Sequence, residues 1–200
     1  MRWTAGLRGM SFLACALSDE DFERHGDRAA ELVHLLNDRG EPEVVDWAIP
    51  LLTDPDEHRR QGAAWVLGQH GFQRGRPYGA QIMPALAAAA RIERDELTRE
   101  FLVTAMGHAE DPSWAEELMS YANDPYPPIR QTVAASLRGL YGYGELPPRA
   151  VDTLVPLMSD NDPHVRDWAT TAIASQTELD TAEIRKLLRA LLDAFCTTLR

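Results

Sequence analysis

Residues 160–175 read DNDPHVRDWATTAIAS, and residues 123–137, NDPYPPIRQTVAASL, carry the same frame. In both stretches an Asp precedes an Arg by six residues, and small or apolar residues follow the Arg at positions three, four and seven. An α-helix turns by about 100° per residue, so these positions share one helical face with the Arg. The frame therefore predicts an amphipathic helix with one apolar side.

The frame occurs four times along the 200 residues. The Arg-to-Arg steps are 39, 31 and 36 residues, and the second copy has Glu in place of Asp. One such spacing has no meaning alone, but four copies in the same apolar context indicate an internal repeat. The four acid and Arg pairs are Asp54/Arg60, Glu93/Arg99, Asp124/Arg130 and Asp160/Arg166.

Each repeat reads as two helices. We call the helix with the Arg helix B, and the amphipathic segment before it helix A. Helix A is predicted at 44–54, 81–93, 114–124 and 150–160. Asp is a favoured N-cap and Pro fits the first helical turn, so we expect helix B to start at Asp-Pro pairs. These pairs are Asp54-Pro55, Asp124-Pro125 and Asp162-Pro163.

This pattern resembles the HEAT-repeat family, specifically its short bacterial HEAT-like repeats, over residues 41–176. The resemblance implies an all-α fold, an α-solenoid or superhelix of antiparallel helix pairs. The family includes scaffolds, transport adaptors, regulatory subunits, phycobilin lyases and DNA alkylation-repair glycosylases. The resemblance therefore says much about the fold and little about the function.

We expect a single continuous structural domain. Residues 1–40 are predicted to hold an N-terminal segment and capping helices, and residues 41–200 the solenoid. Stacked helix pairs bury one continuous core, so the terminal units have to act as caps. The predicted repeats are 41–72, 77–109, 112–141 and 147–176, followed by a terminal half-repeat at 180–200 that has a helix A and no helix B.

The repeated acid and Arg positions allow two interpretations, a row of catalytic groups or a structural ladder. A catalytic group is normally unique, whereas a packing device recurs in every repeat, so the ladder is favoured. In such a ladder each Asp caps helix B, and each Arg pairs with an acid of its own or the next repeat. The predicted members are Asp54, Arg60, Glu93, Arg99, Asp124, Arg130, Asp160 and Arg166.

Positions two, five and nine after each Arg lie opposite the buried face of helix B, and we call them the groove strip. In a solenoid, this side of helix B lines the concave groove. Large aromatic residues stand here where a solvated face would be polar, and aromatic rings are frequent binding hot spots. Two interpretations stay open, a partner-binding groove or rings covered by neighbouring helices. The candidate binding residues are Trp65, Gln69, Phe101, His108, Trp168 and Thr171.

The C-terminal helix carries an apolar stripe that is wider than one neighbouring helix needs. Exposed patches of this kind mark interfaces, so this stripe is a candidate for self-association. The alternative is a cap that folds back on the last repeat. The candidate residues are Leu188, Leu191, Leu192 and Phe195.

The charge and cysteine content limit the partners. With 20 basic and 31 acidic residues, the net charge is −11. This charge argues against binding to nucleic acid and to anionic membranes, and it favours a basic protein or peptide partner. No apolar run is long enough to span a bilayer, and two cysteines, Cys15 and Cys196, are too few for a disulfide framework. We therefore expect a cytoplasmic protein.

No motif for a metal, a cofactor or catalysis stands out. No His pair has HExxH spacing, no GxSxG elbow occurs, and the glycine-rich segments lack a GK[ST] ending. We predict a non-enzymatic adaptor or scaffold with no cofactor and no metal. Two enzyme classes stay open as alternatives. A repair glycosylase would need a basic, aromatic-lined groove with a carboxylate, and a phycobilin-lyase-like enzyme would need a tetrapyrrole-handling site.

Overall fold

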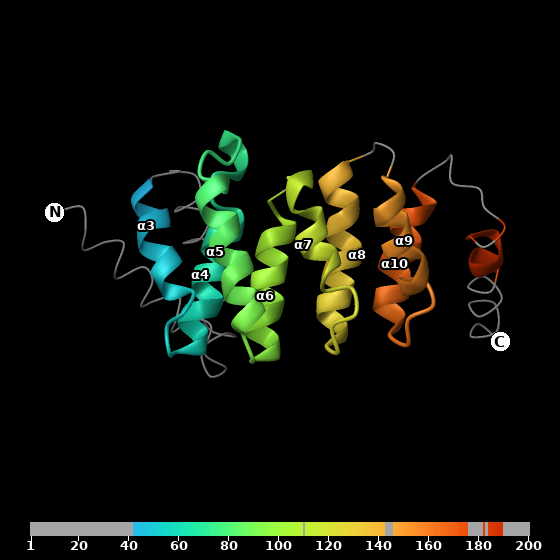
Figure 1. Ribbon diagram of the computed structural model, residues 1–200, viewed down its shortest axis with the longest axis horizontal. Coiled ribbons are helices and arrows are strands. Elements are labelled where there is room, and N and C mark those ends of the chain that lie inside the picture. The colour runs from blue at the N-terminus through green and yellow to red at the C-terminus, as the bar shows by residue number, and fades with distance from the viewer. Residues whose placement is uncertain (1–41, 110, 143–145, 176–181, 183, 190–200) are drawn as a thin grey trace, which may run out of the picture. The chain divides into compact units, whose positions relative to one another are not determined.

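The computed structural model describes residues 42–109, 111–142, 146–175, 182 and 184–189 (Figure 1). Every regular element in these ranges is a helix. The labelled elements are α3 (Pro42–Leu51), α4 (Glu57–Gln69), the 3-10 helix η1 (Phe72–Arg74), α5 (Gly79–Ile92), α6 (Glu96–Gly107), the 3-10 helix η2 (Pro112–Trp114), α7 (Ala115–Met119), α8 (Pro127–Tyr141), α9 (Pro148–Leu157) and α10 (Pro163–Ala174).

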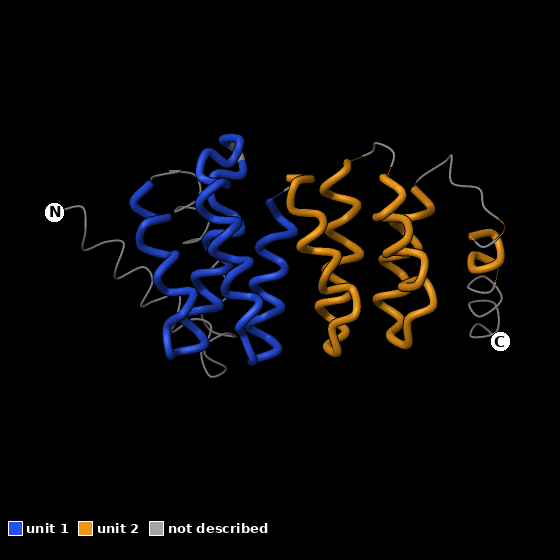
Figure 2. Tube along the Cα trace, viewed as in Figure 1, with its two compact units in different colours: residues 1–109 blue, residues 110–200 orange. Residues whose placement is uncertain are grey.

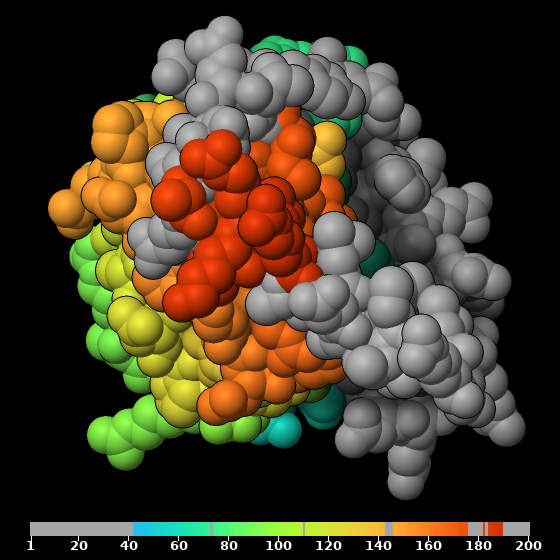
Figure 3. Space-filling model, turned by 90° about the vertical axis from the view of Figure 1, so that its right-hand side faces the viewer, coloured from blue at the N-terminus to red at the C-terminus, as the bar shows by residue number. Residues whose placement is uncertain are grey.

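The chain divides into two compact units, residues 1–109 (unit 1) and residues 110–200 (unit 2) (Figure 2). The boundary falls between the second and third predicted repeats, so each unit holds two of them. The single continuous domain that we expected stays a prediction. Figure 3 looks onto one end of unit 2, where α9 and α10 (orange) and residues 184–189 (red) reach the surface.

The predicted helix pairs are present in both units. In unit 1, α4 packs against α3 and α6, and α5 packs against α6. In unit 2, α8 packs against α7, α9 and α10. The helices with the Arg frame, α4 beside α6 and α8 beside α10, thus form one layer in each unit, and the A helices form the other.

The A helices end earlier than predicted. α3 ends at Leu51 and α9 ends at Leu157, three residues before the predicted ends. Each of these two helices has a proline as its next-to-last residue, Pro50 and Pro156, and proline has no N–H to extend the helical hydrogen bonding. The segment predicted as one helix at 114–124 is the five-residue α7, preceded by η2.

The predicted start of helix B was wrong at two of the three Asp-Pro pairs. Asp56, not Asp54, caps α4, and Asp54 instead accepts the Asp56 N–H at 2.9 Å. Asp124 likewise accepts the Tyr126 N–H at 2.9 Å, and α8 begins after Tyr126 without a side-chain cap. Only Asp162 caps its helix, α10, as predicted. Asp54 and Asp124 instead stabilise the turn before helix B, because an Asp side chain can accept a hydrogen bond from the backbone N–H two residues further on.

The apolar frame forms the core. Of the twelve residues at positions three, four and seven after the four arginines, eleven are buried and Thr170 is half-buried. Leu67, Met106, Leu137 and Ile173, which occupy position seven, are at most 1% exposed. Burying such side chains contributes roughly 1.5–3 kcal/mol each, so the frame supplies much of the stability of each unit.

Candidate functional site

Arg60 joins two successive repeats of unit 1. Its Nη1 donates to the carbonyl of Asp54 at 2.8 Å and of Pro55 at 3.2 Å, within its own turn. Its other edge faces the next turn, where Nε donates to Glu93 at 2.7 Å and Nη2 at 3.3 Å. The Arg60 and Glu93 side chains are only 15% and 9% exposed. Arg60 and Glu93 therefore form a largely buried, bidentate ion pair, and charge-assisted hydrogen bonds of this type are stronger than neutral ones.

Arg130 repeats this geometry in unit 2. Its Nη1 donates to the carbonyl of Asp124 at 2.8 Å and of Pro125 at 3.2 Å. Its Nε and Nη2 donate to the two carboxylate oxygens of Asp160 at 2.8 Å and 2.7 Å. The sequence allowed each Arg to pair with an acid of its own repeat or of the next repeat. Arg60 and Arg130 both make their ion pair with an acid of the next repeat. Within their own repeat, they bond only to backbone carbonyls.

Two further arginines complete the set. Arg166 donates through Nη1 to the carbonyl of Asp160 at 2.8 Å and of Asn161 at 3.1 Å, as Arg60 and Arg130 do at their own turns. Arg99 makes a longer bond, 3.5 Å, to the carbonyl of Glu93. All four arginines are half-buried, and their side chains are engaged in holding turns.

These bonds shift the ionisation of the groups involved. Hydrogen bonding to Arg130 lowers the pKa of Asp160 and raises the pKa of Arg130, so both stay charged. Burial alone would raise the pKa of Glu93, but bonds from Arg60 and from two backbone amides outweigh burial and lower that pKa. A carboxylate held ionised in this way stabilises the turn and is a poor proton donor near neutral pH.

The groove strip of unit 1 is partly covered. Trp65 and Phe101 are half-buried, and neither ring is fully enclosed. The Gln69 amide and the His108 Nδ1 lie 2.8 Å apart, which joins the C-terminal ends of α4 and α6 by a hydrogen bond. His108 itself is exposed.

The groove strip of unit 2 is more open. Trp168 is 41% exposed, and it is the most exposed tryptophan among the described residues. Thr171, one helical turn further on, is exposed as well. The corresponding positions on α8 hold the small residues Thr132 and Ala135, both half-buried. The Trp168 ring therefore lies on a solvent-exposed face of α10.

A group of contacts between α4 and α6 was not predicted from the sequence. Gln61 and Thr98, both buried, share a hydrogen bond of 3.1 Å from the amide to the hydroxyl oxygen. Gly68 lies so close to Ala105 that an added Cβ would stand 2.7 Å from the Ala105 Cα. Both pairs depend on which helices are neighbours, so no local pattern around Gln61 or Gly68 predicts them.

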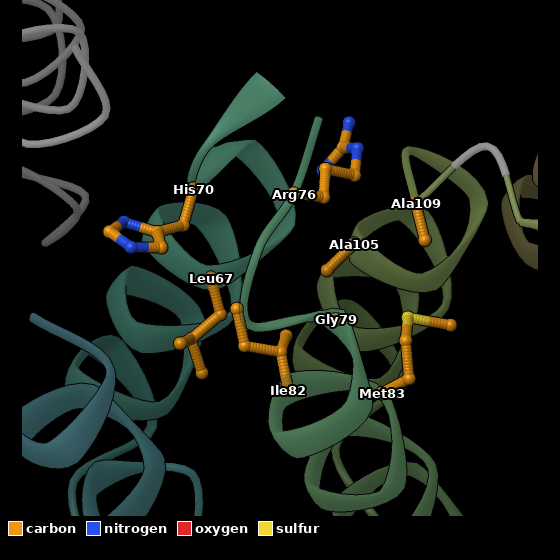
Figure 4. Close-up of a pocket in the computed structure, with 8 residues that line it drawn as sticks. All are labelled: Leu67, His70, Arg76, Gly79, Ile82, Met83, Ala105 and Ala109. Atoms are coloured by element: carbon orange, nitrogen blue, oxygen red, sulfur yellow. The ribbon is translucent and has the colours of Figure 1, made fainter. Parts of the chain in front are cut away.

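A small cavity lies beside the loop that follows α4 (Figure 4). It measures about 10 Å³, room for one water molecule and too small for a ligand. His70 is 1% exposed, and neither ring nitrogen has a hydrogen-bond partner in the described part of the chain. Burial lowers the pKa of His70, so the ring is neutral in the folded protein at neutral pH. The lining residues are Leu67, His70, Arg76, Gly79, Ile82, Met83, Ala105 and Ala109.

Three other large apolar side chains are exposed in unit 1. Ile92 at the end of α5 is 70% exposed, Phe72 in η1 52%, and Leu97 in the first turn of α6 45%. None of them lies in the groove strip, and single exposed apolar residues are normal on protein surfaces. They therefore serve as controls for the aromatic residues of the strip.

Most of the net negative charge lies outside the described residues. The described ranges contain 17 acidic and 14 basic residues, a net charge of −3. The whole chain carries −11. The described helices thus present a nearly balanced surface, and the preference for a basic partner rests on the charge of the whole chain.

Within the described ranges, no group of three or more His, Cys, Asp or Glu residues is arranged to hold a metal ion. No helix in that part of the chain is long and apolar enough to cross a membrane. Leu188 of the predicted self-association stripe is half-buried, whereas Leu191, Leu192 and Phe195 lie outside the described residues.

Comparison with known proteins agrees with these observations. Residues 83–174 match a family model for HEAT repeats. No curated protein matches this chain. The crystal structure of YibA from Escherichia coli is similar, with a TM-score of 0.70 and 19% sequence identity. The similarity covers 92% of this chain and 66% of YibA, so the chain spans just under two thirds of that protein. The family match confirms HEAT repeats over residues 83–174, and the described helices together with the structural match confirm the all-α solenoid class.

Proposed function

Because this chain carries HEAT repeats, as its residues 83–174 show, we propose that it is a non-enzymatic scaffold or adaptor that binds a protein or peptide along the groove strip. The observation that carries the proposal is the exposure of Trp168. An indole ring that is 41% exposed on a helix face loses contact with water when a partner covers it, which is typical of binding hot spots. The acidic charge of the whole chain favours a basic partner.

The ladder residues support a non-enzymatic role. Hydrogen bonds between successive turns join Arg60 to Glu93 and Arg130 to Asp160. Their carboxylates are held ionised, so they are poorly suited to general acid catalysis. We place this function in the cytoplasm, and self-association through the C-terminal helix remains a further part of the proposal.

The test is affinity capture from a lysate of the source cells, comparing the wild-type protein with Trp168→Ala. We expect a specific set of proteins to be lost with this variant, while the thermal unfolding midpoint stays nearly unchanged. Ile92→Ala is the matched control, because Ile92 is a large exposed side chain outside the groove strip. The same set captured by all three proteins would contradict the proposal.

The alternative of a DNA-repair enzyme is tested by duplex DNA binding. Such an enzyme needs basic residues to neutralise phosphates, and the described helices carry a net charge of −3. We expect no binding at moderate salt. Binding that weakens steeply as salt increases would favour the glycosylase class over the scaffold.

A further inference from the structure

Arg166 makes the same backbone hydrogen bonds as Arg60 and Arg130, but among the described residues it lacks their ion pair with a carboxylate. Its Nη1 makes the same two bonds to the carbonyls of its own turn, at 2.8 Å and 3.1 Å. In Arg60 and Arg130, the Nε and Nη2 edge grips the carboxylate of the following turn. No carboxylate occupies this edge of Arg166 in the described part of the chain.

The guanidinium of Arg166 is thus pre-arranged for a carboxylate. Two backbone bonds already fix its plane, so little side-chain freedom remains to be lost when an acid binds. A guanidinium edge with two parallel N–H groups matches a carboxylate in a two-pronged geometry. The two closed pairs show the distance expected for such a complex, 2.7 Å at the shortest bond of each.

Within the part of the chain that the structure describes, the flank of α10 beside Arg166 is also uncovered. In α4, the residues one and eight positions after the Arg, Gln61 and Gly68, are buried against α6. In α8 the corresponding Gln131 and Arg138 are half-buried. In α10 these positions are Asp167 and Ala174, and both are exposed. No described residue therefore buries the side of α10 that would face a following helix B.

The sequence offers no acid at the position where this edge would find one. The two closed pairs join residues that are 33 and 30 positions apart, Arg60 to Glu93 and Arg130 to Asp160. The same distance after Arg166 leads to residues 196–199, which read CTTL and contain no carboxylate side chain. In the register of the closed pairs, residues 196–199 therefore supply no carboxylate side chain for the Arg166 edge.

We infer that the open edge of Arg166 and the free flank of α10 form a docking surface for a helix of a partner protein that carries Asp or Glu in the turn before it. The partner helix takes the place that α6 has beside α4, and its carboxylate takes the place of Glu93. This surface lies about a quarter turn around α10 from the groove strip, so it goes beyond the proposed function.

The chain contains a segment with the required chemistry, which provides a probe. Residues 91–108, RIERDELTREFLVTAMGH, hold the acid Glu93, the α6 helix, and Thr98, whose hydroxyl bonds Gln61. When the peptide lies beside α10 as α6 lies beside α4, its Thr98 hydroxyl faces Asp167, which stands at the position of Gln61. The hydroxyl can then donate a hydrogen bond to the Asp167 carboxylate. A fluorescent peptide of this sequence therefore presents a turn carboxylate, a helix and a suitable hydroxyl to the flank.

The experiment measures fluorescence anisotropy of this peptide with the full-length protein. We expect binding that becomes at least about tenfold weaker when the peptide carries Glu93→Gln or when the protein carries Arg166→Gln. The two losses should not add, because both remove the same ion pair. The second protein variant, Ala174→Trp, blocks the exposed flank without touching the Arg166 turn and should weaken binding as well.

Circular dichroism of each protein variant checks that the helices are retained. The peptide could also displace the chain's own α6 from α4, and in that case Arg166→Gln and Ala174→Trp would bind it as the wild type does. That result would overturn the inference. So would equal affinity for the Glu93→Gln peptide, or no binding at peptide concentrations up to about 1 mM.

Discussion

Gly68 of α4 and Ala105 of α6 pack backbone against backbone: a Cβ added to Gly68 would stand 2.7 Å from the Ala105 Cα and 2.8 Å from its Cβ. Both atoms belong to a rigid helix, so no flexible side chain can move aside. This contact sets how closely the two helices approach in unit 1.

We predict that Gly68→Ala destabilises the protein by about 1–3 kcal/mol, because overpacking forces α4 and α6 apart. The free energy of unfolding from urea denaturation measures the effect. Gly139→Ala in α8 is the matched control, since an added Cβ there meets no atom within 4 Å. Ala favours helix over Gly, so this control should be neutral or stabilising by up to about 1 kcal/mol. Equal effects of the two changes would contradict the close approach.

The ion pair between Arg130 and Asp160 should contribute measurably to stability. We predict that Asp160→Asn lowers the free energy of unfolding by about 1.5–3 kcal/mol, because it leaves a largely buried guanidinium without its charged partner. The control is Arg149→Ala, which breaks the pair with Glu116, where the side chains are 72% and 60% exposed. An exposed pair contributes little, so the control should unfold like the wild type. A double-mutant cycle with Arg130→Gln isolates the pair.

The stability of unit 1 should depend on pH through His70. Burial lowers the pKa of His70 in the folded state, so the unfolded chain binds a proton more readily. Stability is therefore expected to be complete above the ordinary histidine pKa of about 6.5 and to fall as the pH drops below it. His70→Phe should remove this component, as seen in unfolding midpoints measured from neutral to mildly acid pH. The comparison variant is His164→Ala, which removes a histidine from an exposed site.

The buried hydrogen bond between Gln61 and Thr98 allows a fourth prediction. Thr98→Val leaves the Gln61 amide buried without its acceptor, which should cost about 1–3 kcal/mol. In the double variant Gln61→Leu with Thr98→Val, both polar groups are removed, and we expect part of the stability to return. Chemical denaturation of the four proteins in the cycle measures this. Additive losses would show that the bond contributes nothing.

The repeat frame made the fold predictable, because the positions three, four and seven after each Arg depend only on helical periodicity. The predicted burial of Leu67, Met106, Leu137 and Ile173 follows directly from it. Helix ends were less predictable. Asp54 and Asp124 looked like caps, but the turn conformation moved the helix starts two residues further on.

The candidate sites were harder to derive from the sequence. Whether Trp65 or Trp168 is exposed depends on which helices lie beside it, and periodicity alone gives the same answer for both. The structure leaves Trp65 half-buried and Trp168 exposed. The open edge of Arg166 became visible only against the closed pairs of Arg60 and Arg130, since its own sequence context is the most regular of the four.

The bridging arginines also bear on how the protein unfolds. Arg60 binds the carbonyls of one turn and the carboxylate of the next, so fraying of either repeat releases bonds in both. Arg130 does the same in unit 2. In repeat proteins, cooperativity arises from such nearest-neighbour terms and not from the single repeat. We therefore expect the smallest cooperatively unfolding piece of each unit to be a linked pair of repeats, so that deleting either member leaves the other too unstable to persist alone.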